Sequence, residues 1–157
     1  MNNMLKTFST SILALWLVGC GGVVLQPVSS SQSESIANYR FIVIPIEKSI
    51  LSGSGYVTKE FSPDDWIEGI LLKRGLIRAS EVPDGQADKT LILRYANSGT
   101  RDVYMGLGYT MEVSISILES STLRPVYNCT AEGIGDTEVD DLRDAISSCL
   151  SDLVVAK

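Results

Sequence analysis

The stretch that decides the fold is "YTMEVSISILE", residues 109–119. Every second side chain in it is apolar, namely Tyr109, Met111, Val113, Ile115 and Ile117. Because successive side chains of a strand point to opposite faces, this alternation predicts a β-strand with one buried side and one solvent-facing side. The strand should therefore belong to an antiparallel sheet that is covered on one face.

The residues that follow predict a partner strand and a helix. The turn "SSTLR" (120–124) leads into "PVYNCTAEG" (125–133), so the two strands should form a hairpin. Thr137 is a plausible helix N-cap. One apolar stripe follows at helical spacing: Val139, Leu142, Ile146, Cys149, Leu150 and Leu153. This stripe is expected to pack on the buried face of the sheet.

The sequence before the hairpin predicts a further strand and a further helix. "YRFIVIPIE" (39–47) is nearly continuously apolar and indicates a strand, although Pro45 favours an edge or a strand end. "SILSGSGYVTKE" (49–60) is interpreted as a loop. A helix should begin with Ser62 as its cap and Pro63 in the first position. Trp66 is expected to be a core residue of this helix.

Shorter strands are predicted at 76–79 and 90–97, and the whole order defines the fold class. Strands and helices in this order give an α+β domain, a two-layer sandwich over residues 39–157. Its sheet should be mostly antiparallel, with four to five strands, and both helices should lie on one face.

Composition restricts the function classes. A net charge of −6 and a pI of about 4.6 argue against a nucleic-acid partner. The chain has no histidine, so the commonest general base and the usual zinc-ligand patterns are absent. No catalytic residue, metal site or cofactor is predicted, and the protein is expected not to be an enzyme.

Several carboxylates crowd the start of the second predicted helix: Asp136, Glu138, Asp140, Asp141 and Asp144. They lack the spacing of a calcium loop, and acidic residues are favourable at a helix N-terminus. We interpret them as a solvated helix face.

The beginning of the chain predicts export. Lys6 precedes a short apolar segment (11–18), and small residues surround Cys20. This pattern is typical of a secretory signal peptide, here residues 1–19, and the segment is too short to span a bilayer. On these residues alone, Cys20 could also be incidental to an ordinary cleaved signal.

"LVGC" (17–20) resembles the lipobox of bacterial lipoproteins. The resemblance implies cleavage before Cys20, attachment of a diacylglycerol to its thiol and acylation of the new amino terminus. Since Gly21 follows where an aspartate would retain a lipoprotein at the inner membrane, it implies an outer-membrane anchor facing the periplasm. Residues 20–38 would then be the lipidated cysteine and a tether, with the Ser-rich Val28–Asn38 expected to be flexible.

Two cysteines remain if Cys20 is acylated. An oxidising envelope compartment would permit a disulfide between Cys129 and Cys149. From Cys129 the strand runs about five residues, ~16 Å, to the turn. The helix returns over about twelve residues, ~18 Å, from Thr137 to Cys149. The two should lie at one level of the sheet–helix interface, and the alternative is a pair of buried free thiols.

The pattern of residues 108–153 resembles small envelope lipoproteins related in fold to the TolB amino-terminal domain and the curli-assembly lipoprotein. The resemblance implies a non-enzymatic domain that serves envelope assemblies by contacting another envelope protein. The strand-rich surface, or the loop Gly53–Lys59, is the expected contact region. The alternative class is a lipid-anchored small-ligand binder, or a hydrolase without a recognisable motif.

Overall fold

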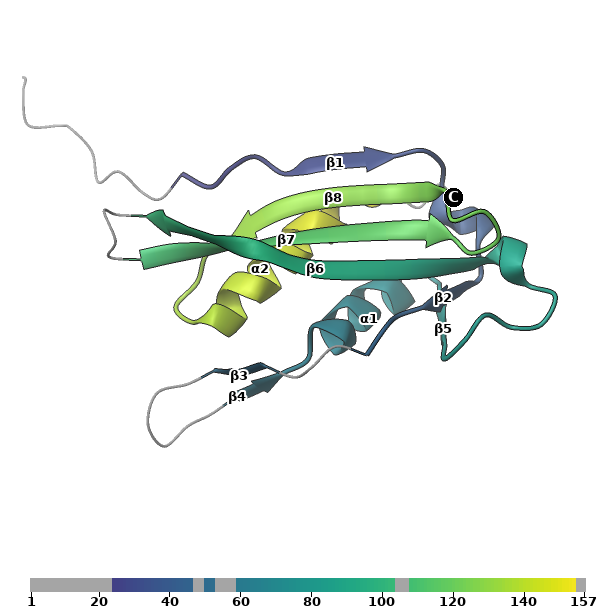
Figure 1. Cartoon of the computed structure of the whole chain (residues 1–157), viewed down its shortest axis with the longest axis horizontal. Coiled ribbons are helices and arrows are strands. Elements are labelled where there is room, and N and C mark those ends of the chain that lie inside the picture. Colours follow the sequence, from purple (N-terminus) through teal and green to yellow (C-terminus); the bar gives the residue numbers. More distant parts are fainter. Residues whose placement is uncertain (1–23, 47–49, 53–58, 104–107, 155–157) are drawn as a thin grey trace, which may run out of the picture.

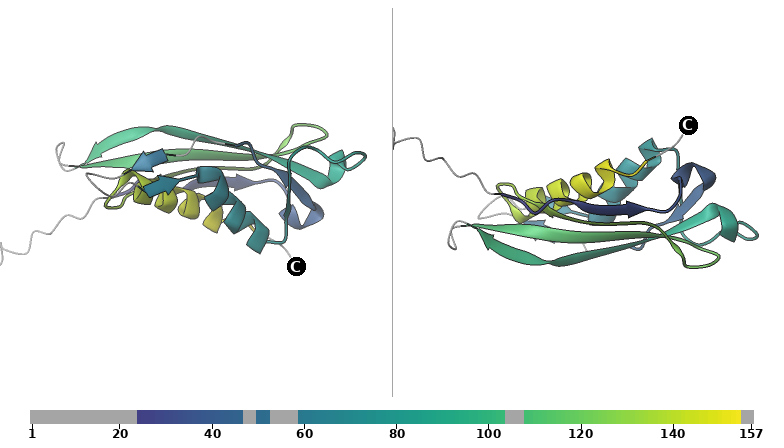
Figure 2. Two further views of the ribbon diagram at one scale, coloured as in Figure 1. Left: turned by 90° about the horizontal axis from the view of Figure 1, so that it is seen from below. Right: turned by 90° about the horizontal axis from the view of Figure 1, so that it is seen from above.

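The computed structural model describes residues 24–46, 50–52, 59–103 and 108–154. These residues form two layers, one a sheet and the other a pair of helices on a single face of it (Figure 1, Figure 2). The main sheet has six strands in the spatial order β1-β8-β7-β6-β2-β5. The α+β class is confirmed, with six strands in the main sheet where four to five were predicted.

Three long antiparallel strands form the centre of the sheet: β6 (Thr90–Val103), β7 (Gly108–Glu119) and β8 (Pro125–Gly133). In β7 the predicted alternation holds for Met111, Val113, Ile115 and Ile117, which are all buried in the core. It fails for Tyr109 at the start of the strand, which is 45% exposed. The predicted hairpin of β7 and β8 is confirmed by their register, in which Ile115 lies opposite Cys129.

Strand β6 continues six residues beyond the predicted end at Asn97. The ladder with β7 shifts register between Asn97 and Gly99. Gly99 has a φ of +142°, which favours glycine, and its N–H donates to the Asn97 side chain. The irregularity lets the strand resume pairing as far as Val103 opposite Gly108.

The other side of the sheet is parallel. Strand β2 (Phe41–Val43) pairs in parallel with both β6 and β5 (Ile77–Ala79), and α1 (Pro63–Lys73) lies between β2 and β5 in the sequence. The predicted strand 39–47 was too long. Its ladder stops before Pro45, because proline has no N–H to donate.

A two-stranded sheet lies where a loop was predicted over residues 49–60. Strands β3 (Ile50–Ser52) and β4 (Lys59–Phe61) pair antiparallel, so the loop interpretation was wrong for both ends of this segment. The predicted contact loop Gly53–Lys59 lies outside the described residues except for Lys59, which begins β4.

The flexible tether over Val28–Asn38 is also contradicted. Strand β1 (Ser29–Gln32) pairs antiparallel with β8, and a 3-10 helix η1 (Ile36–Asn38) follows it. Ile36 is buried in the core. An edge strand is held by its backbone and needs no apolar side chains, so serine-rich sequence can occupy it. The ordered domain therefore begins before the predicted boundary at Tyr39.

Helix α2 (Glu138–Ser151) packs on β7 and β8 with Thr137 as its N-cap. All six residues of the predicted stripe are buried. A short 3-10 helix, η2 (Ala87–Lys89), precedes β6. None of the helices in the described residues is long and apolar enough to cross a bilayer.

Candidate functional site

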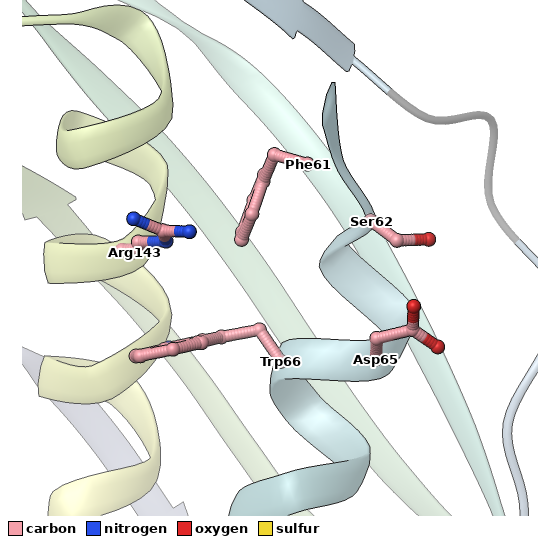
Figure 3. A pocket seen from close by; sticks show the side chains of 5 residues that line it. All are labelled: Phe61, Ser62, Asp65, Trp66 and Arg143. Atoms are coloured by element: carbon pink, nitrogen blue, oxygen red, sulfur yellow. The ribbon is translucent and has the colours of Figure 1, made fainter. Parts of the chain in front are cut away.

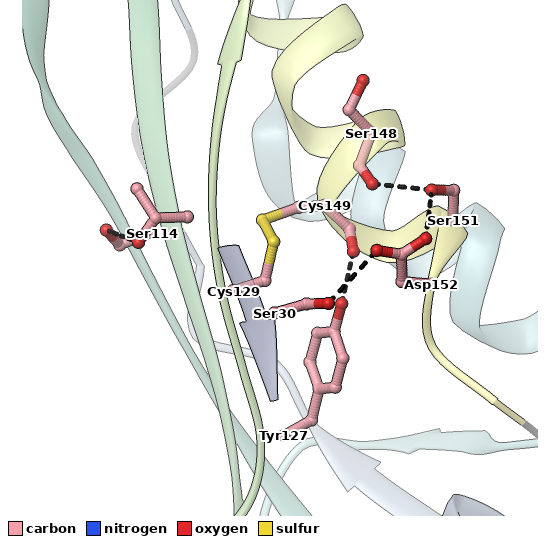
Figure 4. Close-up of a disulfide and its surroundings, with 9 residues drawn as sticks. Ser30, Ser114, Tyr127, Cys129, Ser148, Cys149, Ser151 and Asp152 are labelled. Atoms are coloured by element: carbon pink, nitrogen blue, oxygen red, sulfur yellow. Dashed lines mark hydrogen bonds between the residues drawn. A yellow bond between two sulfur atoms is a disulfide. The ribbon is translucent and has the colours of Figure 1, made fainter. Parts of the chain in front are cut away.

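Cys129 of β8 and Cys149 of α2 form a disulfide, as the sequence predicted (Figure 4). Their Cα atoms are 5.6 Å apart. Both residues are buried, and the neighbouring Tyr127 hydroxyl donates to the carbonyl of Cys149. Burial raises the pKa of Tyr127 above its usual range, so the phenol stays a donor. Helix and sheet are thus joined covalently and by a buried hydrogen bond.

Strand β1 contacts the end of α2 as well as β8. Ser30 donates to the Asp152 carboxylate at 3.1 Å. The Gln32 amide makes two bonds to the backbone of Val154, one to its carbonyl oxygen and one from its N–H, each 2.9 Å long. The N-terminal segment is therefore bound to the C-terminal segment of the domain.

A second contact binds the chain before β1 to the far end of β8 and β6. Glu132 is almost fully buried and receives two hydrogen bonds from the Arg101 guanidinium, at 2.8 and 2.6 Å. The backbone N–H of Gln26 donates to the same carboxylate at 2.9 Å, and Arg101 also donates to the carbonyl of Val24 at 3.1 Å. We call these four residues the N-terminal clamp.

Charge complementarity stabilises the ionised form of the clamp. The hydrogen bond from Arg101 lowers the pKa of Glu132, despite a smaller opposing effect of burial, and the Gln26 N–H lowers it further. The same carboxylate raises the pKa of Arg101. The buried carboxylate is therefore charged at neutral pH, and it joins the N-terminal segment at Gln26 to Arg101 of β6.

A pocket of about 230 Å³ opens between α1 and α2 (Figure 3). Its lining side chains are Phe61, Ser62, Asp65, Trp66 and Arg143. The guanidinium carbon of Arg143 is 5.1 Å from the centre of the Phe61 ring and 5.2 Å from that of Trp66, so the cation faces both rings. We call this arrangement the arginine–aromatic slot.

Trp66 is not the core residue that the sequence predicted. It is 40% exposed, while its indole N–H donates to Ser147 of α2 at 3.1 Å. The core position of α1 one residue later belongs to Ile67, which is fully buried. Helical spacing alone could not distinguish these neighbours, because the exact direction of the buried stripe depends on where α2 lies.

The start of α1 also uses its polar residues differently from expectation. Ser62 is the N-cap, but its hydroxyl donates to the Asp64 carboxylate at 2.6 Å and makes no side-chain cap bond. Asp64 is buried and pairs with Arg78 of β5 at 3.4 Å. This ion pair connects the helix to the edge strand.

The acidic start of α2 is only partly a solvated face. Asp141 is 3% exposed and accepts a hydrogen bond from the backbone N–H of Gly135, which contradicts the prediction for this residue. Burial raises its pKa above the usual range for aspartate. Asp144 accepts from Ile134 at 3.3 Å, and Asp140 completes a mutual cap with Thr137. The carboxylates fix the turn between β8 and α2.

Of the predicted site residues, the described structure contains Cys129 and Cys149 and brings them together. Cys20 lies outside the described residues. Among residues 24–46, 50–52, 59–103 and 108–154, no group of three metal-ligating side chains occurs. Neither the N-terminal clamp nor the arginine–aromatic slot was predicted from the sequence. Arg101 and Glu132 are 31 residues apart, so no local sequence pattern indicates that they pair. The one available signal is that Glu132 is a charged residue at the end of a strand whose neighbouring residues are buried.

No family model matches the sequence, and no curated protein matches it. Two structures of PelC from Paraburkholderia phytofirmans, both dodecamers, are similar in fold. One, a single-substitution variant, has a TM-score of 0.54 at 16% identity and covers 83% of this chain and 98% of that chain. The other has a TM-score of 0.51 at 14% identity and covers 83% and 99%.

A PDZ domain protein from Parabacteroides distasonis is also similar, with a TM-score of 0.50 at 12% identity. The similarity covers 85% of this chain and 36% of that longer one. At these identities the similarity shows the fold alone. The resemblances to lipoproteins and to the TolB amino-terminal domain stay predictions.

Proposed function

We propose that the protein is a lipid-anchored module of the bacterial envelope that acts by binding other proteins and not by catalysis. The observation that carries the envelope location in this proposal is the disulfide Cys129–Cys149. Disulfides of this kind persist in oxidising compartments, and this one leaves Cys20 as the remaining thiol of the chain. Together with the lipobox resemblance, this favours an exported protein in which Cys20 carries lipid at the outer membrane, facing the periplasm.

The partner is expected to be another envelope protein or a further copy of the chain. The PelC structures of similar fold are dodecamers, so self-association has to be tested first. Light scattering of residues 20–157 carrying Cys20→Ser measures it without the lipid. A monomer that also captures no partner in crosslinked envelopes would contradict the module.

Lipid attachment is tested in the full chain expressed in a Gram-negative host. Cys20→Ala should abolish incorporation of labelled palmitate and release the protein from membranes washed with high salt. The matched control is the double variant Cys129→Ala/Cys149→Ala, which should keep the label because it retains Cys20. A Cys20→Ala protein that stays labelled would contradict the anchor.

The arginine–aromatic slot favours a second function, the binding of a small ligand. Trp66 is partly exposed beside a cation in a pocket of about 230 Å³, and such a site suits a planar or anionic compound. Ligand binding would change the fluorescence of Trp66 in the mature chain. Arg143→Met should remove that response, and a metabolite screen without any response would leave the binding of proteins as the better proposal.

The class of the protein would change if the purified domain converted an envelope substrate and lost that activity when one serine or carboxylate was replaced. The protein would then be an enzyme.

A further inference from the structure

The N-terminal clamp determines where the domain stands relative to a lipid anchor. Val24, the first described residue, is held by Arg101, and it is the fourth residue after Cys20. Four residues span at most about 14 Å when fully extended. An acyl chain on Cys20 would therefore keep the bilayer surface within about 14 Å of the clamp.

The clamp lies at one defined end of the sheet. Gly133, the last residue of β8, lies opposite Met111 of β7. Thr110, which precedes Met111 in β7, lies opposite Arg101 of β6. Both β6 and β7 extend two residues past Arg101 and Thr110, to the pair Val103 and Gly108. At 3.3 to 3.4 Å per residue, this hairpin end projects about 7 Å beyond the clamp.

The hairpin end and the lipid anchor therefore share one end of the domain. The clamp and the bilayer surface can be at most about 14 Å apart. The ends of β6 and β7 project about 7 Å into that distance and so cover about half of it. The exposed side chains there include Tyr109, which is 45% exposed, and Val24, which is 83% exposed. Tyrosine has an apolar ring and a polar hydroxyl, which suits the boundary between headgroups and acyl chains.

We propose that the described end of the β6–β7 hairpin, with Val24 and Tyr109, contacts the lipid surface, so that the domain stands with its sheet pointing into the bilayer headgroups. The inference rests on the proposed lipid anchor at Cys20. It also depends on β1, because a flexible segment over residues 28–38 would have let the domain move farther from the bilayer. The opposite end of the sheet, at the β7–β8 turn, then faces away from the membrane, about 30 Å distant along β7.

The test supplies the anchor chemically. Residues 20–157 contain every described element, and Cys20 is the one thiol outside the disulfide, so it can be coupled to a maleimide lipid in phosphatidylcholine vesicles. Within residues 20–157 the one tryptophan is Trp66, and Trp66→Phe removes it. Tyr109→Trp then places a reporter at the hairpin end, and Leu123→Trp places one on an exposed residue of the β7–β8 turn.

Vesicles with brominated acyl chains quench tryptophans that contact lipid. The Tyr109→Trp reporter should be quenched at least two-fold more than the Leu123→Trp reporter. Inserting twelve Gly and Ser residues between Gly22 and Val23 should remove this difference, because it releases the domain. Equal quenching of both reporters, stronger quenching at the turn, or no effect of the insertion would each overturn the inference.

The two proposals fail separately in these experiments. If palmitate labelling fails but the coupled protein shows the predicted quenching, the native anchor is wrong and the geometry of the clamp is right. If labelling succeeds and the quenching pattern is absent, the lipid anchor stands and the lipid-facing hairpin end is wrong.

Discussion

Arg101 of β6 and Glu132 of β8 form a two-bond ion pair across the intervening strand β7, and the backbone of Gln26 donates to the same carboxylate. The pair thereby holds a segment more than 70 residues away in sequence from Arg101. Glu132 is 4% exposed, so its charge depends on these partners.

Removing the cation should release the N-terminal segment. Arg101→Met leaves a buried carboxylate without its main partner, so we expect faster amide exchange over residues 24–32 and a lower midpoint of thermal unfolding. Arg94→Met, an exposed arginine on the same strand, is the matched control. Unchanged exchange over residues 24–32 in the Arg101 variant would show that β1 pairing alone holds the segment.

The same contact predicts a pH dependence. Folding lowers the pKa of Glu132, so its contribution to stability is present above the unfolded value, ~4.3, and is lost as pH falls through the folded value. Protection of residues 24–32 should therefore decrease below about pH 4. The variant Glu132→Gln should show low protection that changes little between pH 7 and pH 3.

A small residue at the end of β8 is required by the closeness of α2. A Cβ atom on Gly133 would lie 2.0 Å from the carbonyl oxygen of Asp141 and 2.4 Å from the backbone nitrogen of Ala145. Gly133→Ala should lower the free energy of unfolding by about 2–3 kcal/mol. Gly69→Ala in α1, where a Cβ meets open space, should raise it by up to about 1 kcal/mol. Equal effects of the two changes in denaturant unfolding would contradict this packing.

The disulfide should contribute strongly to stability. It closes a loop with a sequence separation of 20 residues, for which chain entropy predicts about 3 kcal/mol. The double variant Cys129→Ala/Cys149→Ala should unfold roughly 10 °C lower than the parent. Adding a reductant should lower the parent to the same midpoint and leave the double variant unchanged. A reductant that acts equally on both proteins would contradict the assignment.

Asp141 has the opposite pH behaviour to Glu132. Burial raises its pKa in the folded state, so folding disfavours the charged form, and the penalty grows as pH rises through the folded value. Asp141→Asn keeps an acceptor for the Gly135 N–H and should stabilise the protein at pH 7. The gain should shrink on acidification. The exposed Asp136→Asn serves as control and should show no such trend.

The sequence by itself determined the central elements of this protein. Alternation in residues 109–119 was enough to predict β7 and its buried face, since strand periodicity is a local property. The stripe from Val139 to Leu153 predicted α2 and its buried side in the same way. Chain reach along one strand and one helix was also sufficient to place Cys129 beside Cys149, because only a tight turn separates the two elements.

Only the tertiary structure decided the roles of the outer elements. Ser29–Gln32 is polar and became an ordered strand because β8 offered it an unpaired backbone edge. Trp66 became part of a slot because Arg143 of α2 lies against its ring. Arg101, Glu132 and Gln26 meet through pairing between distant segments, which no local pattern encodes. Contacts of this kind depend on the register of the whole sheet, and for that reason the sequence predicted a free tether where the folded chain holds its own N-terminal segment.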